Sequence, residues 1–201
     1  MHRVTAPALS ALAFFFVMTA YYIVRPVRDQ LSGAVGSQSL PLFYGAVFLV
    51  MLAIAPAFGM LVARFRRRQL LGWSYSFFIL CLLAFIPAFL AQEHIGARAL
   101  GVVFFVWVSV FNLFVVSLFW SFMADIFTSG EARRTFSLIA LGGMGGALFG
   151  PLVTKFLVRL IGVAPLLLVS ALMLALALAL LLKLSVRGGQ VAGGTDAAIG
   201  G

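Results

Sequence analysis

Apolar residues fill six long runs of the chain, and polar or charged residues gather in the short segments between them. A helix needs about 20 apolar residues to cross the hydrocarbon of a bilayer. The runs are apolar on every side rather than at alternate positions, which favours helices over a membrane β-barrel. We expect spans at residues 6–24 (or on to 31), 40–63, 70–91, 100–124, 136–158 and 164–184. The pattern predicts an all-α integral membrane protein with six transmembrane helices.

The composition agrees with this fold class. Hydrophobic residues make up 64% of the 201 residues and charged residues only 9%, whereas soluble domains carry about 25% charged residues. The net charge of +9 fits the excess of basic residues on the cytoplasmic side of membrane proteins. No aromatic-basic groove or recognition helix accompanies it. We therefore expect the lipid bilayer as a partner and no nucleic acid.

The basic residues also predict an orientation. With the N-terminus inside, nine of the fourteen fall on the cytoplasmic side, so the N- and C-termini are expected in the cytoplasm and the protein in the cell (inner) membrane. The other five face outward: Arg25, Arg28, Arg98, Lys155 and Arg159. Arg25 and Arg28 thus lie on the disfavoured side, and their position needs another reason.

The domain organisation follows from the end of the last apolar run. Residues 1–184 form the expected six-helix bundle, and residues 185–201, rich in glycine and alanine, are expected as a flexible linker or tail. Six helices leading into a linker are typical of half a transporter. A C-terminal six-helix half or a second copy would complete it; the alternative is a non-transporting half-bundle that acts as a membrane assembly partner.

A charged cluster at the end of the first span is the main candidate site. On a helix Arg25, Arg28 and Asp29 share one face. A charge inside the bilayer costs at least about 2.5–3.5 kcal/mol, so such residues usually face a cavity or a partner. Two guanidiniums bind carboxylate or phosphate, and Asp29 would compensate their charge. In the alternative, the helix ends near Val24 and the arginines reach lipid headgroups.

Two further polar positions extend this hypothesis. Lys155, near the outer end of the fifth span, either joins the arginines in an anion-attracting cavity or reaches the headgroups. Asn112, with Ser109 three residues before it, either lines the substrate path or hydrogen-bonds a neighbouring helix. Both alternatives remain open for each position.

Glycines mark the fifth span. Gly142, Gly146 and Gly150 recur every fourth residue and share one face, which predicts close packing against another helix; the alternative is a gating hinge. The stretch resembles the Gly-x-x-x-Gly-Pro element of the major facilitator superfamily.

The segment after the second span resembles the loop between helices two and three of the same superfamily. Gly59, Leu61, Arg67 and Arg68 match its pattern, while Ala63 replaces the aspartate. The charged residues at this end predict an inner gate of salt bridges, the alternative being a solvated loop that sets topology. The predicted gate comprises Arg64, Arg67, Arg68, Asp125, Glu131, Arg133 and Arg134.

A longer resemblance is to the ATP/ADP translocase (nucleotide exchange transporter) family. It rests on Leu118, Phe119, Trp120, Phe122, Thr128, Glu131, Ala132, Arg133 and Arg134, and on Arg25, Arg28 and Asp29. The resemblance implies a facilitator-type fold of two six-helix halves, with this chain as the N-terminal half, and exchange of ATP for ADP. The family's carboxylate midway along helix four is absent here, where Asn112 is the polar residue.

These observations predict a secondary active transporter that works by alternating access and moves a small organic anion, a nucleotide among the candidates. The alternative substrate is an unrelated small molecule. The chain lacks a catalytic constellation, a nucleotide-phosphate loop and metal-ligand spacing, so we expect neither an enzyme nor a metal or cofactor.

Overall fold

The computed structural model describes residues 5–34, 40–91, 96–127 and 129–191. These residues form the helices α1 (Thr5–Ala34), α2 (Leu40–Arg64), α3 (Arg67–Leu90), α5 (Ala97–Ile126), α6 (Ser129–Ile161) and α7 (Val163–Val191). Each of the six is long and apolar enough to cross a membrane. Within this part of the chain, the prediction of an all-α membrane bundle with six spans is confirmed.

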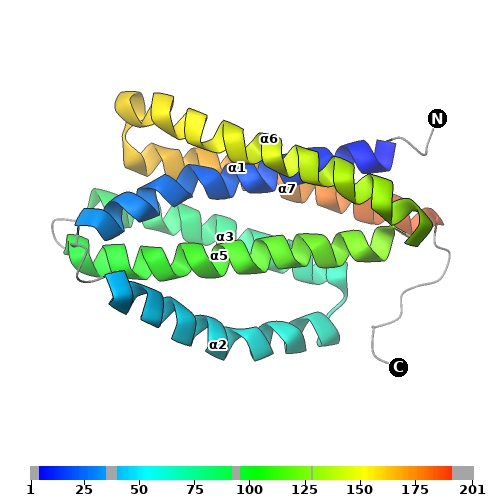
Figure 1. The fold of residues 1–201 in the computed structure, drawn as a ribbon, viewed down its shortest axis with the longest axis horizontal. Helices are drawn as coiled ribbons and strands as arrows, with labels where there is room; N and C mark the ends of the chain where they lie inside the picture. The colour runs from blue at the N-terminus through cyan, green and yellow to red at the C-terminus, as the bar shows by residue number, and fades with distance from the viewer. Residues whose placement is uncertain (1–4, 35–39, 92–95, 128, 192–201) are drawn as a thin grey trace.

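Successive helices run in opposite directions (Figure 1). The first turn of α1 and the last turn of α7 lie at one end of the bundle, together with the α2–α3 and α5–α6 connections. We call this the terminal end. The gate candidates lie at the terminal end, whereas Arg25, Arg28 and Asp29 lie at the opposite end, which we call the far end.

The helices form two layers. α6, α1, α5 and α2 follow one another in a row, since α1 packs on both α6 and α5, and α2 packs on α5. α7 and α3 make the second layer, because α7 packs on α1 and α3, and α3 packs on α5. α1 is thus the central helix of the row, with neighbours on two sides and behind it.

Glycines bring α6 onto the backbone of α1. A Cβ atom built on Gly142 or Gly146 would collide with the carbonyl oxygen of Ala11 or Phe15, respectively, and one on Gly150 would lie 2.6 Å from Tyr22 Cβ. Only a hydrogen in place of the side chain permits this approach. The packing interpretation of the glycine face is therefore confirmed.

Hydrogen bonds from small polar side chains tie the layers together inside the apolar bundle. Ser170 Oγ on α7 donates to the Ala20 carbonyl of α1 at 2.8 Å, and Thr154 Oγ1 on α6 donates to the Ile23 carbonyl at 3.2 Å. Tyr75 OH on α3 donates to the Val115 carbonyl of α5 at 3.1 Å. In lipid, unpaired hydroxyls are costly, so these bonds fix the register of the helices.

Two helix ends differ from the expected ones. α1 continues past Val24 to Ala34, so the alternative in which it ends near Val24 is wrong. α7 continues past Leu184 to Val191, and residues 185–191, expected in the tail, are helical. Propagating an existing helix adds one backbone hydrogen bond per residue, and Ser185 Oγ adds a bond to the Leu182 carbonyl at 2.7 Å. Residues 192–201 lie outside the described part.

Candidate functional site

The three charged residues at the far end of α1 form one cluster. Arg28 Nε and Nη2 both donate to Asp29 Oδ1, at 2.9 and 2.7 Å. Arg25 Nε lies 3.8 Å from Asp29 Oδ2, so the carboxylate lies between the two guanidiniums. The expectation that Arg25, Arg28 and Asp29 share a face and that Asp29 compensates the arginines is met by this geometry.

Both arginines of the cluster contact aromatic rings. The guanidinium carbon of Arg28 lies 4.9 Å from the centre of the Phe105 ring on α5, and that of Arg25 lies 5.4 Å from the Tyr22 ring. A ring face attracts a cation and holds a planar guanidinium flat. Phe105 is itself buried against Phe43 and Tyr44 of α2. Arg28 is therefore supported by residues from α1, α5 and α2.

The two arginines differ in exposure. The Arg28 side chain is 14% exposed, whereas those of Arg25 and Asp29 are 44% and 51% exposed. Arg28 is thus largely covered by its neighbours, whereas Arg25 and Asp29 are exposed on the surface of the helix. The binding role of Arg28 stays a prediction.

Asn112 lies on the same face of α5 as Phe105, because seven residues make two turns. It is half-buried and about 10 Å further along the helix. At that level Tyr21 of α1 lies beside α5, with its ring 6.5 Å from that of Phe111. Asn112 is therefore separate from the cluster, and its place on a substrate path stays a prediction. Ser109 donates to the carbonyl of Phe105 on its own helix at 3.0 Å.

Lys155 is exposed and follows Thr154, which faces α1. Among the described residues no hydrogen bond or ion pair joins Lys155 to the cluster. Its part in an anion site therefore stays a prediction.

The terminal end carries the predicted gate. The side chains of Arg64, Arg68, Asp125 and Arg134 are exposed there, and Asp125 takes part in an interaction. The side chains of Arg67, Glu131 and Arg133 lie outside the described part. Phe65 packs on Trp73, with ring centres 5.5 Å apart, and closes the α2–α3 connection. The salt-bridge gate stays a prediction.

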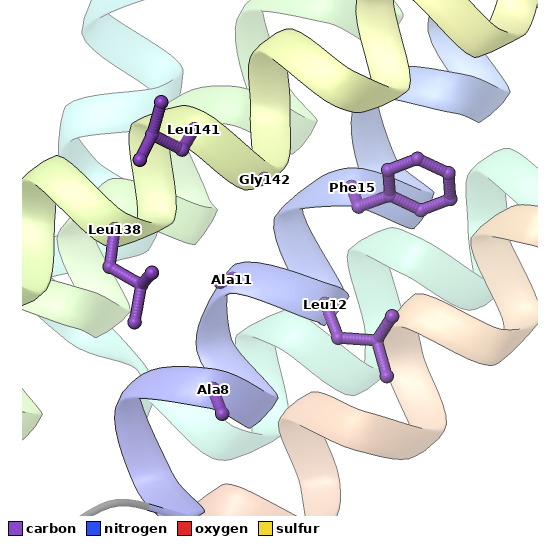
Figure 2. A pocket seen from close by; sticks show the side chains of 7 residues that line it. All are labelled: Ala8, Ala11, Leu12, Phe15, Leu138, Leu141 and Gly142. Atoms are coloured by element: carbon purple, nitrogen blue, oxygen red, sulfur yellow. The ribbon is translucent and has the colours of Figure 1, made fainter.

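The described surface has two hollows that no residue of the charged cluster lines. Figure 2 shows the first, of about 470 Å³, between α1 and α6 and lined by Ala8, Ala11, Leu12, Phe15, Leu138, Leu141 and Gly142. The second, of about 490 Å³, lies at the far end, and its lining includes Val27, Gln30 and Phe89. The first is apolar throughout and the second has one polar side chain, Gln30. Neither offers a charged group to a substrate.

A comparison with protein families identifies the class of protein to which the chain belongs. A family model described as sugar (and other) transporter matches residues 9–186, nearly the whole described bundle. The chain belongs to the sugar (and other) transporter family. This family is of the major facilitator type, so the six-helix bundle is that of a multi-pass membrane transporter. No curated protein and no solved structure matches the chain.

The family match shows a transporter of the major facilitator type, but it does not show that the chain is an ATP/ADP translocase. The alternative of a facilitator-type transporter for another small molecule is compatible with it. The described bundle has the architecture expected of the N-terminal half of such a transporter.

The sequence did not point to the aromatic support of the cluster. Phe105 and Tyr22 contact the arginines and Tyr44 packs on Phe105, yet aromatic residues are common in every span of this chain. The one available signal was the seven-residue step between Phe105 and Asn112, which places them on one face.

Proposed function

We propose that this transporter moves a small organic anion by alternating access. The observation that carries the proposal is Arg28, which is 14% exposed and stacked on Phe105 within an apolar helix bundle. A guanidinium held in this way offers charged N–H donors to a carboxylate or phosphate, because the bonds to Asp29 use Nε and Nη2 and leave the donors on its Nη1 side. Arg25, Arg28 and Asp29 are the proposed binding residues, with Asn112 and Lys155 further along the path.

Topology supports the same proposal. Positive charges are disfavoured on the outer side of a membrane protein, and both arginines lie at the far end, away from most of the basic residues. Their retention in an apolar helix is explained by a ligand that needs positive charge. Exchange of ATP for ADP is the narrower form of this function.

A neutral sugar is the second candidate. Membership of the sugar (and other) transporter family favours it, and a paired arginine and aspartate can also hydrogen-bond hydroxyl groups. Tyr21, Tyr22 and Asn112 would then supply the ring stacking and amide contacts that sugars accept. The two candidates differ in whether the substrate must carry charge.

Counterflow into proteoliposomes that contain the full-length protein separates these candidates. We expect saturable uptake of at least one labelled organic anion, from a panel of monocarboxylates, organic phosphates and nucleotides, with competition by other anions but not by glucose. Uptake of glucose alone would show that the substrate is a neutral sugar and not an anion. If no compound on the panel moves, the non-transporting assembly role becomes the better explanation.

A second six-helix bundle is the partner that alternating access needs. The cluster is open on one side, and within the apolar span of α2, Phe43–Arg64, only Phe43 is buried. A C-terminal half or a second copy would enclose the substrate between two bundles. Which of the two does so stays a prediction.

The proposed orientation has the terminal end in the cytoplasm of a cell (inner) membrane. We expect a single cysteine at Gln30 to react with a membrane-impermeant maleimide in intact cells, and one at Arg68 to react only after the membrane is opened. Both positions are exposed, and Cys81, the only native cysteine, is replaced by alanine in both. Labelling of the Arg68 position alone in intact cells would reverse the orientation.

A further inference from the structure

Asp29 occupies the edge of Arg28 that an anionic substrate would use. Arg28 presents Nε and Nη2 side by side, the pair of donors that usually grips a carboxylate. Both donate to Asp29 Oδ1, at 2.9 and 2.7 Å. The protein's own carboxylate therefore fills the strongest anion position of the cluster.

This pairing is not imposed by the helix. Neighbouring residues of a helix point about 100° apart and do not face each other. Arg28 has to fold back to reach Asp29, and the Phe105 ring holds its guanidinium 4.9 Å away in that position. Asp29 Oδ2 also lies 3.8 Å from Arg25 Nε. A single carboxylate thus serves both arginines.

The charge left over is one positive unit. In the ion pairs of α1, two guanidiniums share one carboxylate, and Asp29 takes part in a further interaction as well. The donors that Asp29 leaves open are on Arg25 and on the Nη1 side of Arg28, since a guanidinium has five N–H groups. An anion bound to those donors lies beside the Asp29 carboxylate. One negative charge neutralises the cluster, whereas a second meets the repulsion of Asp29.

We propose that Asp29 is the residue that sets charge selectivity, so that the site takes organic monoanions and rejects dianions and more highly charged compounds. The inference rests on the proposed anion-binding function and narrows its substrate class. It opposes the narrower proposal of ATP/ADP exchange, because it places multiply charged nucleotides among the poor substrates. Specificity then comes from a repulsive element as well as from an attractive one.

Butyrate and succinate test this proposal, because they have the same carbon count and carry one and two charges at pH 7. Stabilisation of the purified full-length protein against thermal unfolding reports their binding. We expect the wild type to prefer butyrate. In Asp29→Asn we expect the ratio of succinate to butyrate affinity to rise by about ten- to a hundredfold, and in Asp29→Glu we expect the wild-type preference.

Gln30→Lys is the matched control. It adds one positive unit on the same turn, as Asp29→Asn does, but leaves the Asp29–Arg28 bonds in place, and Gln30 is exposed. A shift in Asp29→Asn without one in Gln30→Lys supports the proposal. Equal shifts of the affinity ratio in both variants would show that surface charge in general, rather than Asp29, sets the preference. An unchanged preference in Asp29→Asn would reject the proposal even if the protein binds anions. If the wild type binds neither acid while another anion of the transport panel moves, the inference fails and the anion function stands; if no anion of the panel binds or moves, both fail.

Discussion

Replacing Gly146 by alanine is expected to separate α1 from α6 and to lower the free energy of unfolding by about 3 kcal/mol or more. The added Cβ would collide with the carbonyl oxygen of Phe15 and lie 3.0 Å from Thr19 N. Both are backbone atoms of a helix, so they cannot turn aside as the end of a flexible side chain does. α1 is the central helix, and moving it disturbs its contacts with α5 and α7 as well.

Gly145→Ala is the matched control on the same helix. Its Cβ would lie 3.4 Å from Phe15 Cδ2, an ordinary contact, and alanine gains up to about 1 kcal/mol over glycine in a helix. We therefore expect Gly145→Ala to melt at or above the wild-type temperature in detergent, and Gly146→Ala to melt well below it or to aggregate during size-exclusion chromatography. Equal melting of the two variants would show that α6 does not contact α1 through this face.

The same contact explains why the glycine face was readable from the sequence. A four-residue repeat of glycine is a local pattern, and helix geometry turns it into one smooth face. The pattern says that a helix packs there, but it does not name the partner. That the partner is α1, at Ala11, Phe15 and Tyr22, depends on how all six helices assemble.

Only part of the charged cluster could likewise be predicted from the sequence. The spacing of Arg25, Arg28 and Asp29 predicted one shared face, and the contact of Arg25 with Asp29, four residues apart, follows from it. Phe105 and Tyr44 come from α5 and α2, and the sequence has many equivalent aromatic residues. The end of α1 was also open to two interpretations, because a run of apolar residues stops where charges begin whether or not the helix stops there.

Replacing Arg28 is expected to have the largest effect on substrate. A hydrogen bond to a charged group contributes about 1.5–3 kcal/mol, so Arg28→Ala should weaken binding of an organic anion about ten- to a hundredfold. The loss should exceed that in Arg25→Ala, because Arg28 is 14% exposed and ring-supported while Arg25 is 44% exposed. Equilibrium binding or counterflow of the transported anion measures both.

Arg28→Lys sharpens this test, since it keeps the charge and removes the planar fork. A lysine ammonium lacks the planar fork that bonds Asp29 through Nε and Nη2 and still leaves the Nη1 side to an anion, so we expect Arg28→Lys to recover little of the lost affinity. Full recovery would mean that the site needs positive charge alone. Arg98→Gln is the control, because Arg98 is an exposed cation at the same end of the bundle, and it should bind as the wild type does.

The yield of folded protein decides between a binding residue and an anchor. Arg28 contributes one ring contact to the packing of the bundle, worth about 0.5–1 kcal/mol at a partly exposed site. Arg28→Ala should therefore fold nearly as well as the wild type while losing the anion. If folded yield falls in step with binding, and Arg28→Lys restores both, then Arg28 serves to hold α1 at the membrane surface and the anion site must be sought elsewhere in the bundle.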